Sequence, residues 1–479
     1  MIAPVTFGKK NRNTTVRRVL CAMILTLALS SCATYYHQHY DFNQEFERGD
    51  LKQALETLKK NDKEAQGKSR FVYYNNTGVL LSILGQYEES NTYFEKAFLF
   101  GEDYKVNYIN EAASYFTNPN FTVYRGEDHE HLMLLYFKAI NYLKLNKPEE
   151  ALVECRRLNI RLNQLSDKYS AEKKFQRDAF IHTLMGIIYQ STKDYNNAFI
   201  AYRNAVEVYE QEYATMFSMS IPEQLKKDLL NTAYWTGFTE DVEKYKEKFG
   251  MPDYQPSQPD ADLVFFWHNG LAPVKDEWSI NFVINHAQDN VVMFNNDMLG
   301  ISFPYKVSDD KQKTDLKSLE VFRVAFPKYT ERALYYNSAS LELDSASYPL
   351  EMAEDINKVA FYSLKQRMVQ EFSKGLLRAA LKKATEHSVK KDNETFGAVI
   401  GLMNAITEKA DTRNWQTLPH DIHYARVPLK EGSNAVKFTL QSSSQKSTTY
   451  NFTYQATKGQ TLFHTFSSLE STSAPYRFY

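Results

Sequence analysis

An internal repeat constrains the fold of this 479-residue chain more strongly than any other feature of its sequence. Small, aromatic and turn-forming residues recur at the same offsets in two separate segments. One set is Gly78, Leu81, Gly85, Tyr87, Ser90, Phe94 and Ala97, and the other is Gly186, Tyr189, Lys193, Tyr195, Ala198, Tyr202 and Ala205. A partial copy lies between them at Ala139, Tyr142, Asn146, Ala151, Cys155 and Leu158. This recurrence predicts a series of packed helical hairpins.

The pattern resembles the tetratricopeptide repeat, in which a small residue on one helix of a hairpin lets a bulky ring approach closely. We expect an array of such hairpins over residues 32–250. Extra helices are expected at Tyr104–Phe116 and Leu162–Gln176, because the copies are spaced more widely than one repeat of about 34 residues. Cys155 falls on the apolar side of a helix, which predicts a buried thiol.

Arrays of this kind bind extended peptides or partner helices along their concave face. Eight residues are expected to line that face as a groove for a protein partner: Val72, Asn75, Val79, Ser82, Phe180, Thr183, Ile187 and Gln190. Their apolar and uncharged polar side chains suit an extended peptide. The groove lacks the lysine and asparagine set that would grip a C-terminal carboxylate, which disfavours a receptor for chaperone tails.

A group of prolines divides the chain at a linker expected over residues 251–260, because proline ends helices and favours extended backbone. Strands rich in Val, Ile, Phe and Tyr are expected in the remaining residues, 261–479. They are Leu263–Trp267, Glu277–Asn285, Val291–Phe294, Leu319–Phe326, Ala333–Leu343, Ile422–Val427, Ala435–Gln441, Thr448–Gln455 and Thr461–Phe466. A helical insert is expected at about 349–409, opened by Pro349 and including an apolar helix at Phe396–Ile406.

The expected fold class is therefore α+β. A tetratricopeptide-like helical hairpin array comes first in the chain, and a β-rich, sandwich-like module with a helical insert follows it.

The N-terminal residues 1–31 have the composition of an export signal. A basic segment, Lys9–Arg18, precedes the apolar stretch Val19–Ser31. As a helix this stretch rises only about 20 Å, too little to cross a hydrocarbon core of about 30 Å. The sequence Leu29-Ser30-Ser31-Cys32 resembles the lipobox of bacterial lipoproteins, and the resemblance implies cleavage before Cys32 and its diacylation. The alternative is an ordinary secretory signal with a chance cysteine.

No aspartate follows Cys32 directly, which disfavours retention in the inner membrane by the enterobacterial rule. We therefore expect a lipid anchor in the cell envelope, in the outer membrane and facing the periplasm. Each methylene group buried in the bilayer contributes about 0.8 kcal/mol to membrane binding, so two or three acyl chains together anchor a protein stably.

Five stretches are similar to those of an uncharacterised bacterial tetratricopeptide lipoprotein family: Tyr124–Glu127, His268–Lys275, Val324–Tyr329, Ala410–Pro419 and Ala425–Leu429. Members of this family are sometimes encoded near activators of penicillin-binding proteins. The resemblance implies the architecture and an association with cell-wall assembly, and it transfers no catalytic residue.

Within Ala410–Pro419, the residues Asp411, Arg413 and Trp415 form a second candidate patch between a helix and a strand. An Asp–Arg pair can lock a turn by charge-assisted hydrogen bonds, while a tryptophan anchors the turn to the core. The other interpretation of this patch is a contact site for a partner or a glycan.

Two histidine-containing stretches have alternative interpretations. Asp128-His129-Glu130-His131 could hold a metal, but its spacing matches no His-Glu-x-x-His pattern, and acidic residues are expected at the start of a helix. His420 and His423 flank Asp421 but do not form a catalytic triad, because no nucleophile is in view.

Composition and motifs exclude several functions. Lys and Arg number 57 against 58 Asp and Glu, so no basic excess favours nucleic acid. The patterns G-x-x-x-x-G-K-[ST], G-x-S-x-G, H-E-x-x-H and C-x-x-C are absent.

We expect a non-enzymatic scaffold with no catalytic residue, metal or cofactor, joined to the membrane by its lipid and to a protein partner. The alternative is a carbohydrate- or peptidoglycan-acting enzyme, or a glycan-binding module, in the C-terminal part; an enzyme would need two facing carboxylates in a deep cleft.

Overall fold

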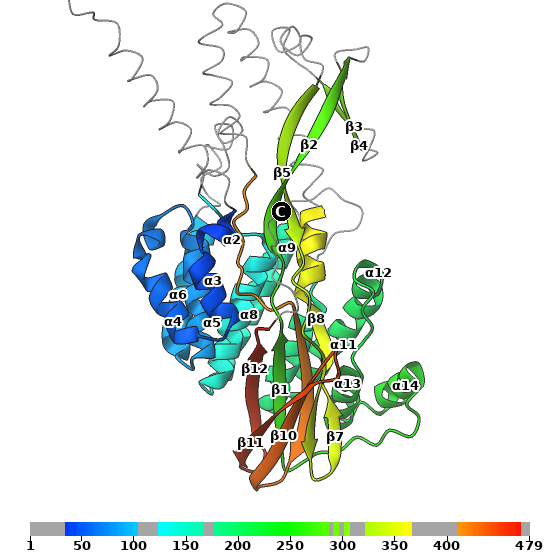
Figure 1. Cartoon of the computed structure of the whole chain (residues 1–479). Coiled ribbons are helices and arrows are strands. Elements are labelled where there is room, and N and C mark those ends of the chain that lie inside the picture. Colours follow the sequence, from blue (N-terminus) through cyan, green and yellow to red (C-terminus); the bar gives the residue numbers. More distant parts are fainter. Residues whose placement is uncertain are drawn as a thin grey trace, which may run out of the picture.

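The computed structural model describes residues 34–103, 123–166, 177–286, 291–296, 301–306, 321–365 and 410–470. The expected signal segment with Cys32, the helix at Tyr104–Phe116 and the apolar helix at Phe396–Ile406 lie outside the described residues. Among the described residues, the elements are helical as far as Phe249, and strands begin at Ala261 (Figure 1). The predicted α+β class, with a tetratricopeptide-like helical region before a β-rich region, is confirmed.

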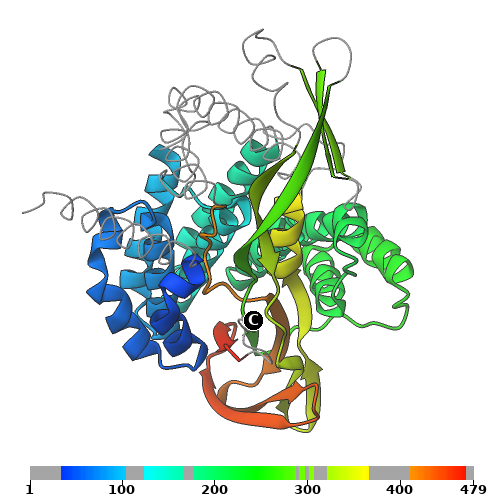
Figure 2. The ribbon, with the colours of Figure 1, turned by 45° about the horizontal axis from the view of Figure 1, so that its top comes forward.

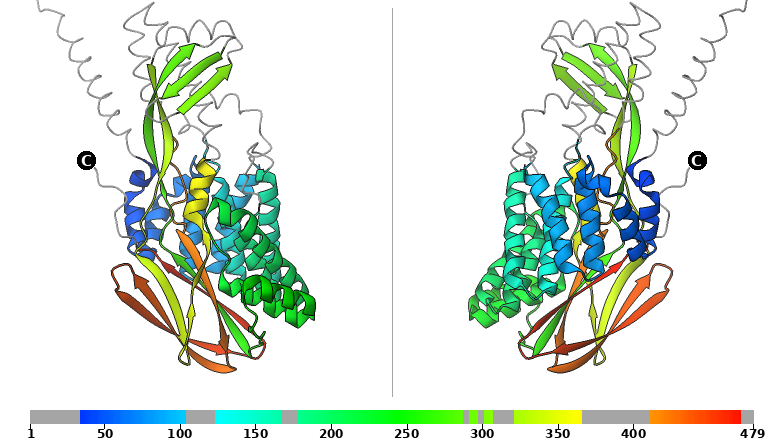
Figure 3. Two further views of the ribbon diagram at one scale, coloured as in Figure 1. Left: turned by 90° about the vertical axis from the view of Figure 1, so that its right-hand side faces the viewer. Right: turned by 90° about the vertical axis from the view of Figure 1, so that its left-hand side faces the viewer.

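The helical region is a stack of antiparallel hairpins, seen side by side in Figure 3. Three short helices precede the stack: α2 (Tyr35–Gln38), α3 (Tyr40–Glu47) and α4 (Leu51–Lys60). The hairpins are α5 (Arg70–Ile83) with α6 (Tyr87–Asp103), α8 (Asp128–Lys144) with α9 (Pro148–Ser166), α10 (Ala179–Ser191) with α11 (Tyr195–Val208), and α13 (Glu223–Thr236) with α14 (Thr239–Phe249). Helix α11 continues through a π-helical turn, Tyr209–Tyr213, into α12 (Ala214–Met216). No helix among the described ranges is both long and apolar enough to cross a membrane.

The repeat residues have the roles that their spacing predicts. A Cβ atom on Gly78 would lie 2.6 Å from the ring of Phe94, and one on Gly186 would lie 2.4 Å from the ring of Tyr202. Only glycine lets these rings pack so close to the helix backbone. The turn positions Gly85, Asn146 and Lys193 all have left-handed backbone, with φ of 80°, 56° and 64°, which ends the first helix of each hairpin.

The described residues of the β-rich region form three four-stranded sheets. One sheet has the order β12-β1-β9-β8 and a second has the order β11-β10-β6-β7, and these two pack face to face. The third, β4-β3-β2-β5, projects away from the other two (Figure 1). The strands are β1 (Ala261–Asn269), β2 (Val274–His286), β3 (Val291–Asn296), β4 (Ile301–Lys306), β5 (Val321–Thr330), β6 (Tyr336–Leu343), β7 (Ala346–Pro349), β8 (Glu351–Asp355), β9 (Asp421–Leu429), β10 (Gly432–Ser442), β11 (Ser447–Ala456) and β12 (Thr461–Ser468).

The expected start of the helical insert is wrong. Pro349 ends the edge strand β7, where a missing N–H is tolerated, and after Leu350 the residues Glu351–Asp355 form β8, which pairs with β9. A helix follows over 356–365, and the Asp355 carboxylate accepts a hydrogen bond from the Lys358 N–H, 2.8 Å away, as an N-cap does. The sequence analysis also did not predict strands β4 and β7. Both are short, β4 contains Pro304, and β7 ends at Pro349.

Strand β1 is buried on both faces and joins the two halves of the molecule. Leu263, Phe265 and Trp267 belong to the core between the two packed sheets. Val264 and Phe266, on the opposite face, belong to a core that is continuous with the interior of the helical array. The layers are therefore helices, first sheet and second sheet. The division of the chain into residues 32–250 and 261–479 stays a prediction, and one of the two main cores of the described residues belongs to both parts.

Candidate functional site

The eight residues expected to line a partner groove lie on α5 and α10, but that surface is not open. Seven of them are buried: Val72, Asn75, Val79, Phe180, Thr183, Ile187 and Gln190. Ser82 is partly buried, and its hydroxyl donates to the Asn141 amide oxygen, 2.6 Å away. The prediction that these residues line an open groove is therefore wrong, because their side chains are covered by the rest of the chain.

The chain's own C-terminal part closes the concave face. Figure 2 shows the segment after residue 410, in orange, passing between the helices and the strands. The ring of Phe180 packs against Phe266 of β1, with centroids 6.3 Å apart. The Gln190 amide oxygen accepts a hydrogen bond from Arg426 of β9, 3.1 Å away. Inner-face residues that could bind a peptide in an open tetratricopeptide array thus bind strands β1 and β9 of the same chain.

Trp415 anchors this segment in the helical array. Its ring lies 6.0 Å from the ring of Phe94 and 5.9 Å from that of Phe137. Its backbone N–H donates to Glu130 at 2.6 Å, and its indole N–H donates to Thr417 at 2.8 Å. The side chain is 1% exposed, so Trp415 acts here as a core anchor and is not accessible to a glycan.

Asp411 and Arg413 lock the turn before Trp415. The Arg413 guanidinium donates to both carboxylate oxygens of Asp411, at 2.8 and 2.6 Å, and to the Lys68 carbonyl oxygen at 3.3 Å. The guanidinium also lies over the ring of Tyr124, 5.2 Å from its centroid. Because Arg413 is buried, the second candidate patch has the geometry of a structural turn within the seam between helices and strands.

A buried charge cluster lies beside this turn. Lys275 forms an ion pair with Glu127, and both side chains are almost fully buried. The Lys275 ammonium also lies 5.6 Å from the centroid of the Tyr124 ring and 5.8 Å from that of Tyr329. The neighbouring Glu130 accepts hydrogen bonds from the Tyr124 hydroxyl and the Glu127 N–H, each at 2.8 Å. Burial raises the pKa of Glu130 to about 7, although Lys275 and the Trp415 N–H favour its ionised form.

Arg426 forms a second buried charge cluster. Its guanidinium donates to Asp228 on α13 at 3.0 Å and to Asp262 on β1 at 2.6 Å. It also reaches the Tyr202 hydroxyl on α11 at 3.3 Å. Asp228 is fully buried, and this burial raises the pKa of its carboxyl while Arg426 acts in the opposite direction. This one arginine connects the helical array to the first sheet.

The five stretches that carry the family resemblance therefore all lie in one seam. Four of them meet at the Lys275–Glu127 cluster, which includes Tyr329 and the turn at Arg413. The fifth, Ala425–Leu429, contributes Arg426. Their shared role is to hold the β-rich part against the helices.

The acidic histidine stretch has the geometry of a helix start. The Glu130 carboxylate accepts the N–H of Glu127, the residue before α8, as in a capping box. His131 Nε2 lies 2.8 Å from the Arg125 carbonyl oxygen, whereas His129 packs against Tyr329. Within the described ranges, no group of three or more Asp, Glu, His or Cys side chains is arranged to hold a metal ion.

Asp421 lies between the two histidines that flank it in sequence. Its carboxylate is 3.0 Å from His420 Nδ1 and 2.9 Å from His423 Nε2, and Glu331 lies 3.1 Å from His420 Nε2. Burial opposes ionisation, but the two histidines hold the pKa of Asp421 below its usual value. The ring of His423 packs against Trp267, 4.8 Å away. These contacts fix the start of β9.

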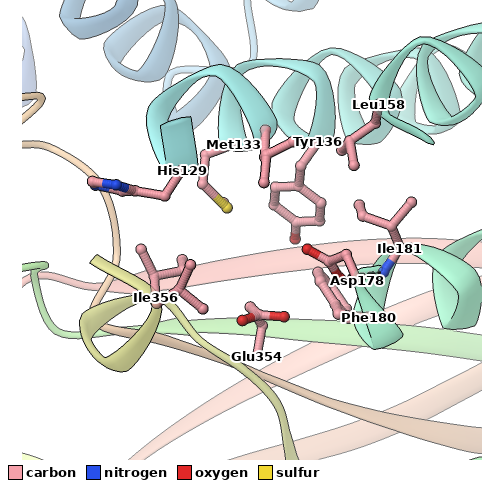
Figure 4. Close-up of a pocket in the computed structure, with 11 residues that line it drawn as sticks. His129, Met133, Tyr136, Leu158, Asp178, Phe180, Ile181, Glu354 and Ile356 are labelled. Carbon is pink, nitrogen blue, oxygen red and sulfur yellow. Dashed lines mark hydrogen bonds between the residues drawn. The ribbon is translucent and has the colours of Figure 1, made fainter. Parts of the chain in front are cut away.

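Two buried carboxylates that the sequence analysis did not identify face a small cavity between α8, α10 and β8 (Figure 4). Asp178 caps α10 by accepting the Ile181 N–H at 2.9 Å, and Glu354 accepts the Tyr213 hydroxyl at 2.8 Å. Burial raises the pKa of Asp178 to about 6 and raises that of Glu354 as well. The cavity volume is about 20 Å³, enough for a water molecule and far too small for a sugar ring. This is not the deep cleft that a glycosidase requires.

Arg332 is a further seam residue that sequence reasoning missed. It is 1% exposed, and it donates to the carbonyl oxygens of Ala272 and Gln416 and to the Glu47 carboxylate on α3. A single arginine after a strand carries no sequence signal for burial, since arginine is usually exposed.

Comparisons with known proteins agree with the helical repeats. The tetratricopeptide repeat family model matches residues 181–212, the hairpin of α10 and α11. No curated protein matches the chain. Among solved structures, the apo form of RapI is similar at 16% identity and a TM-score of 0.33, over 45% of this chain and 52% of RapI. A MamA fragment from Desulfovibrio magneticus RS-1 is similar at 18% identity and a TM-score of 0.28, over 46% of this chain and 96% of the fragment. The chain thus spans about half the length of RapI, and it contains a tetratricopeptide repeat.

Replacing Arg426 by Met should destabilise the protein strongly. The change leaves the buried carboxylate of Asp228 without its cation, and breaking a buried ion pair in this way costs about 3–5 kcal/mol. Urea unfolding followed by circular dichroism measures the loss. Adding Asp228→Asn should recover part of it. The control is Lys437→Met, whose partner Glu342 is half exposed, and it should cost less than about 1 kcal/mol. Equal losses for the two single variants would contradict the role of Arg426.

His268 should make the stability depend on pH. Its Nε2 lies 2.8 Å from the Tyr136 hydroxyl, and burial lowers the pKa of His268 to about 3. The unfolded chain binds a proton below about pH 6.5 that the folded chain excludes, so stability falls as the pH falls toward 3. At pH 5 this contribution is about 2 kcal/mol lower than at pH 7.

The measurement is urea unfolding of the wild type and of His268→Phe at both pH values. The variant should lose less stability than the wild type between pH 7 and 5, whatever its own stability at pH 7. Comparing the two proteins cancels the pH-dependent stability contributed by other groups. One of these is Asp178, whose raised pKa stabilises the folded chain as the pH falls. An identical pH dependence in the two proteins would show that His268 is not held neutral.

Proposed function

We propose that this chain is a lipid-anchored scaffold of the bacterial cell envelope that holds a protein partner. The observation that carries the proposal is the tetratricopeptide repeat at 181–212, within a stack of helical hairpins of the kind that mediates protein association. The cavity beside Asp178 and Glu354, with a volume of about 20 Å³, is too small for a sugar ring and gives no support to the alternative of a carbohydrate-acting enzyme.

Partner contact in this proposal lies outside the concave face, because the chain's own sheet and the 410–419 segment fill that face. The projecting sheet β4-β3-β2-β5 is the candidate surface. It stands clear of the two packed sheets (Figure 3), and Val283 on β2 is 44% exposed. An exposed apolar side chain on a projecting sheet is suited to contact with another protein.

The proposed anchor would hold the body close to the lipid surface. Tyr35 is buried, and its N–H donates to the Thr412 hydroxyl at 2.9 Å, so the body begins within three residues of Cys32. Such a connection spans at most about 10 Å. Helix α2 contacts β2, so the anchor would emerge beside the base of the projecting sheet.

The location and pathway follow from the resemblance to bacterial lipoproteins. The outer membrane, facing the periplasm, is the proposed site, and an envelope protein involved in cell-wall assembly is the proposed class of partner.

Cys32→Ser should release the protein from the membrane. The substitution removes the thiol that would accept diacylglycerol, and no other lipid attachment is proposed. Fractionation of cells that export each protein, with mass analysis of the mature N-terminus, measures the change. The wild type should appear in the detergent-soluble membrane fraction and the variant in the periplasmic fraction. An exported variant that stays in the membrane fraction would contradict the lipid anchor.

A photo-crosslinking amino acid at Val283 should capture the partner in intact cells. The matched control is the same amino acid at Ile160 on α9, which is 57% exposed and lies on the helical array. The expected result is a discrete crosslinked product from position 283 and none from 160, and Cys32→Ser should reduce it. Crosslinking at 160 alone would move the partner surface to the helices.

A further inference from the structure

The edge strands of the three sheets differ in how they are protected against pairing with another chain. Natural proteins protect such edges with charges, prolines, bulges, short strands or a covering helix. In the projecting sheet, the edges β4 and β5 contain Pro304 with Lys306 and Pro327 with Lys328. Strand β7 has four residues and ends at Pro349.

The two edges of the first sheet are also protected. Strand β8 has five residues, three of them acidic, and its register with β9 shifts between Met352 and Glu354. Strand β12 is approached by α8, whose Lys144 ammonium donates to the Phe463 carbonyl oxygen at 3.1 Å. Five of the six edges in the described sheets therefore carry a recognisable protection.

Strand β11 is the exception. Its ten residues, Ser-Thr-Thr-Tyr-Asn-Phe-Thr-Tyr-Gln-Ala, include no charge, proline or glycine. It pairs with β10 in one unbroken register, from Gly432 opposite Ala456 to Gln441 opposite Ser447. In the described part of the chain no strand pairs with its outer side. A long, regular and uncharged edge is suited to adding another strand.

The side chains of β11 alternate regularly between two environments. Thr449, Asn451 and Thr453 are exposed on the outer face. Tyr450, Phe452 and Tyr454 point into the sandwich but are only partly buried; Tyr450 packs on Phe466, 4.7 Å away, and Phe452 packs on His464, 4.6 Å away. A strand added beside β11 would cover this open aromatic row.

We propose that a second copy of this chain pairs with this edge, β11 against β11, antiparallel across a two-fold axis at Phe452. In this register Phe452 faces its own counterpart and Tyr450 faces Tyr454, so each aromatic residue meets an aromatic residue. Asn451 faces Thr453, and no like charges meet because the strand carries none. The pairing is self-complementary, as a two-fold interface must be, and it joins the two β11-β10-β6-β7 sheets into one.

The proposal goes beyond the proposed scaffold function and does not depend on the lipid anchor. Strand β11 lies at the end of the molecule away from the projecting sheet and α2 (Figure 1). The two surfaces are therefore separate, and the dimer can be tested in the mature, non-lipidated chain carrying Cys32→Ser.

Sedimentation velocity of this chain over a range of micromolar concentrations should give the mass of a dimer. Thr449→Lys with Thr453→Lys places like charges across the proposed axis and should raise the dimer Kd at least about tenfold, with an unchanged circular dichroism spectrum. The matched control is Ala435→Lys with Gln441→Lys, two exposed positions on the same face of β10, one strand from the edge. This control should leave the dimer intact.

A second readout uses disulfide formation. Asn451→Cys with Thr453→Cys puts a thiol pair on either side of the proposed axis, and the native Cys155 is buried. Mild oxidation should give a covalent dimer at low protein concentration. A chain that stays monomeric at all concentrations, or a dimer that neither responds to the lysine pair nor crosslinks at 451 and 453, would overturn the proposal. Either result would leave the Val283 and Cys32 experiments unaffected.

Discussion

The rest of this structure depends on one contact, the burial of the β1 and β9 face against the inner surface of the helical array. Strand β1 has apolar residues on both faces. One face of its sheet would therefore expose apolar side chains to water if the helices did not cover it. The helices in turn have an apolar inner surface, against which the first sheet, the 410–419 segment, the loop at Leu271 and the helix at 356–365 pack. Trp415 and Arg426 fix the relative position of the two parts, one by packing and the other by ion pairs. Each part thus completes the other's core.

This closure changes what the tetratricopeptide repeats can do. An open array offers its concave face to a peptide, whereas here that face is occupied within the molecule, and Gln190 binds Arg426. In the proposed function, a partner therefore contacts an outward surface, the projecting sheet, and the β11 edge is a second outward surface. The buried carboxylates Asp178 and Glu354 belong to the same closed seam, with room beside them for only a water molecule.

Sequence reasoning succeeded where local packing decides the structure. The close approaches at Gly78 and Gly186 and the left-handed turns at Asn146 and Lys193 follow from residue types at fixed offsets. It failed where distant segments decide. Pro349 looked like the start of a helix, but pairing with β9 makes the following residues a strand. The groove residues were placed on the correct inner helices, yet an apolar helix face has the same pattern whether a partner or the same chain covers it. The seam arginines and carboxylates give no local signal, because their burial depends on partners far away in sequence.

Differential scanning calorimetry of the non-lipidated mature chain tests the shared core most directly. A chain whose helices and first sheet complete one another's core should unfold in one cooperative transition, with equal calorimetric and van't Hoff enthalpies. Tryptophan fluorescence, which follows Trp267 and Trp415 among others, and far-ultraviolet circular dichroism, which follows the helices, should give the same midpoint. Two separate transitions, with the helical signal surviving after the tryptophan signal is lost, would contradict the shared core and restore an independent array with an open concave face.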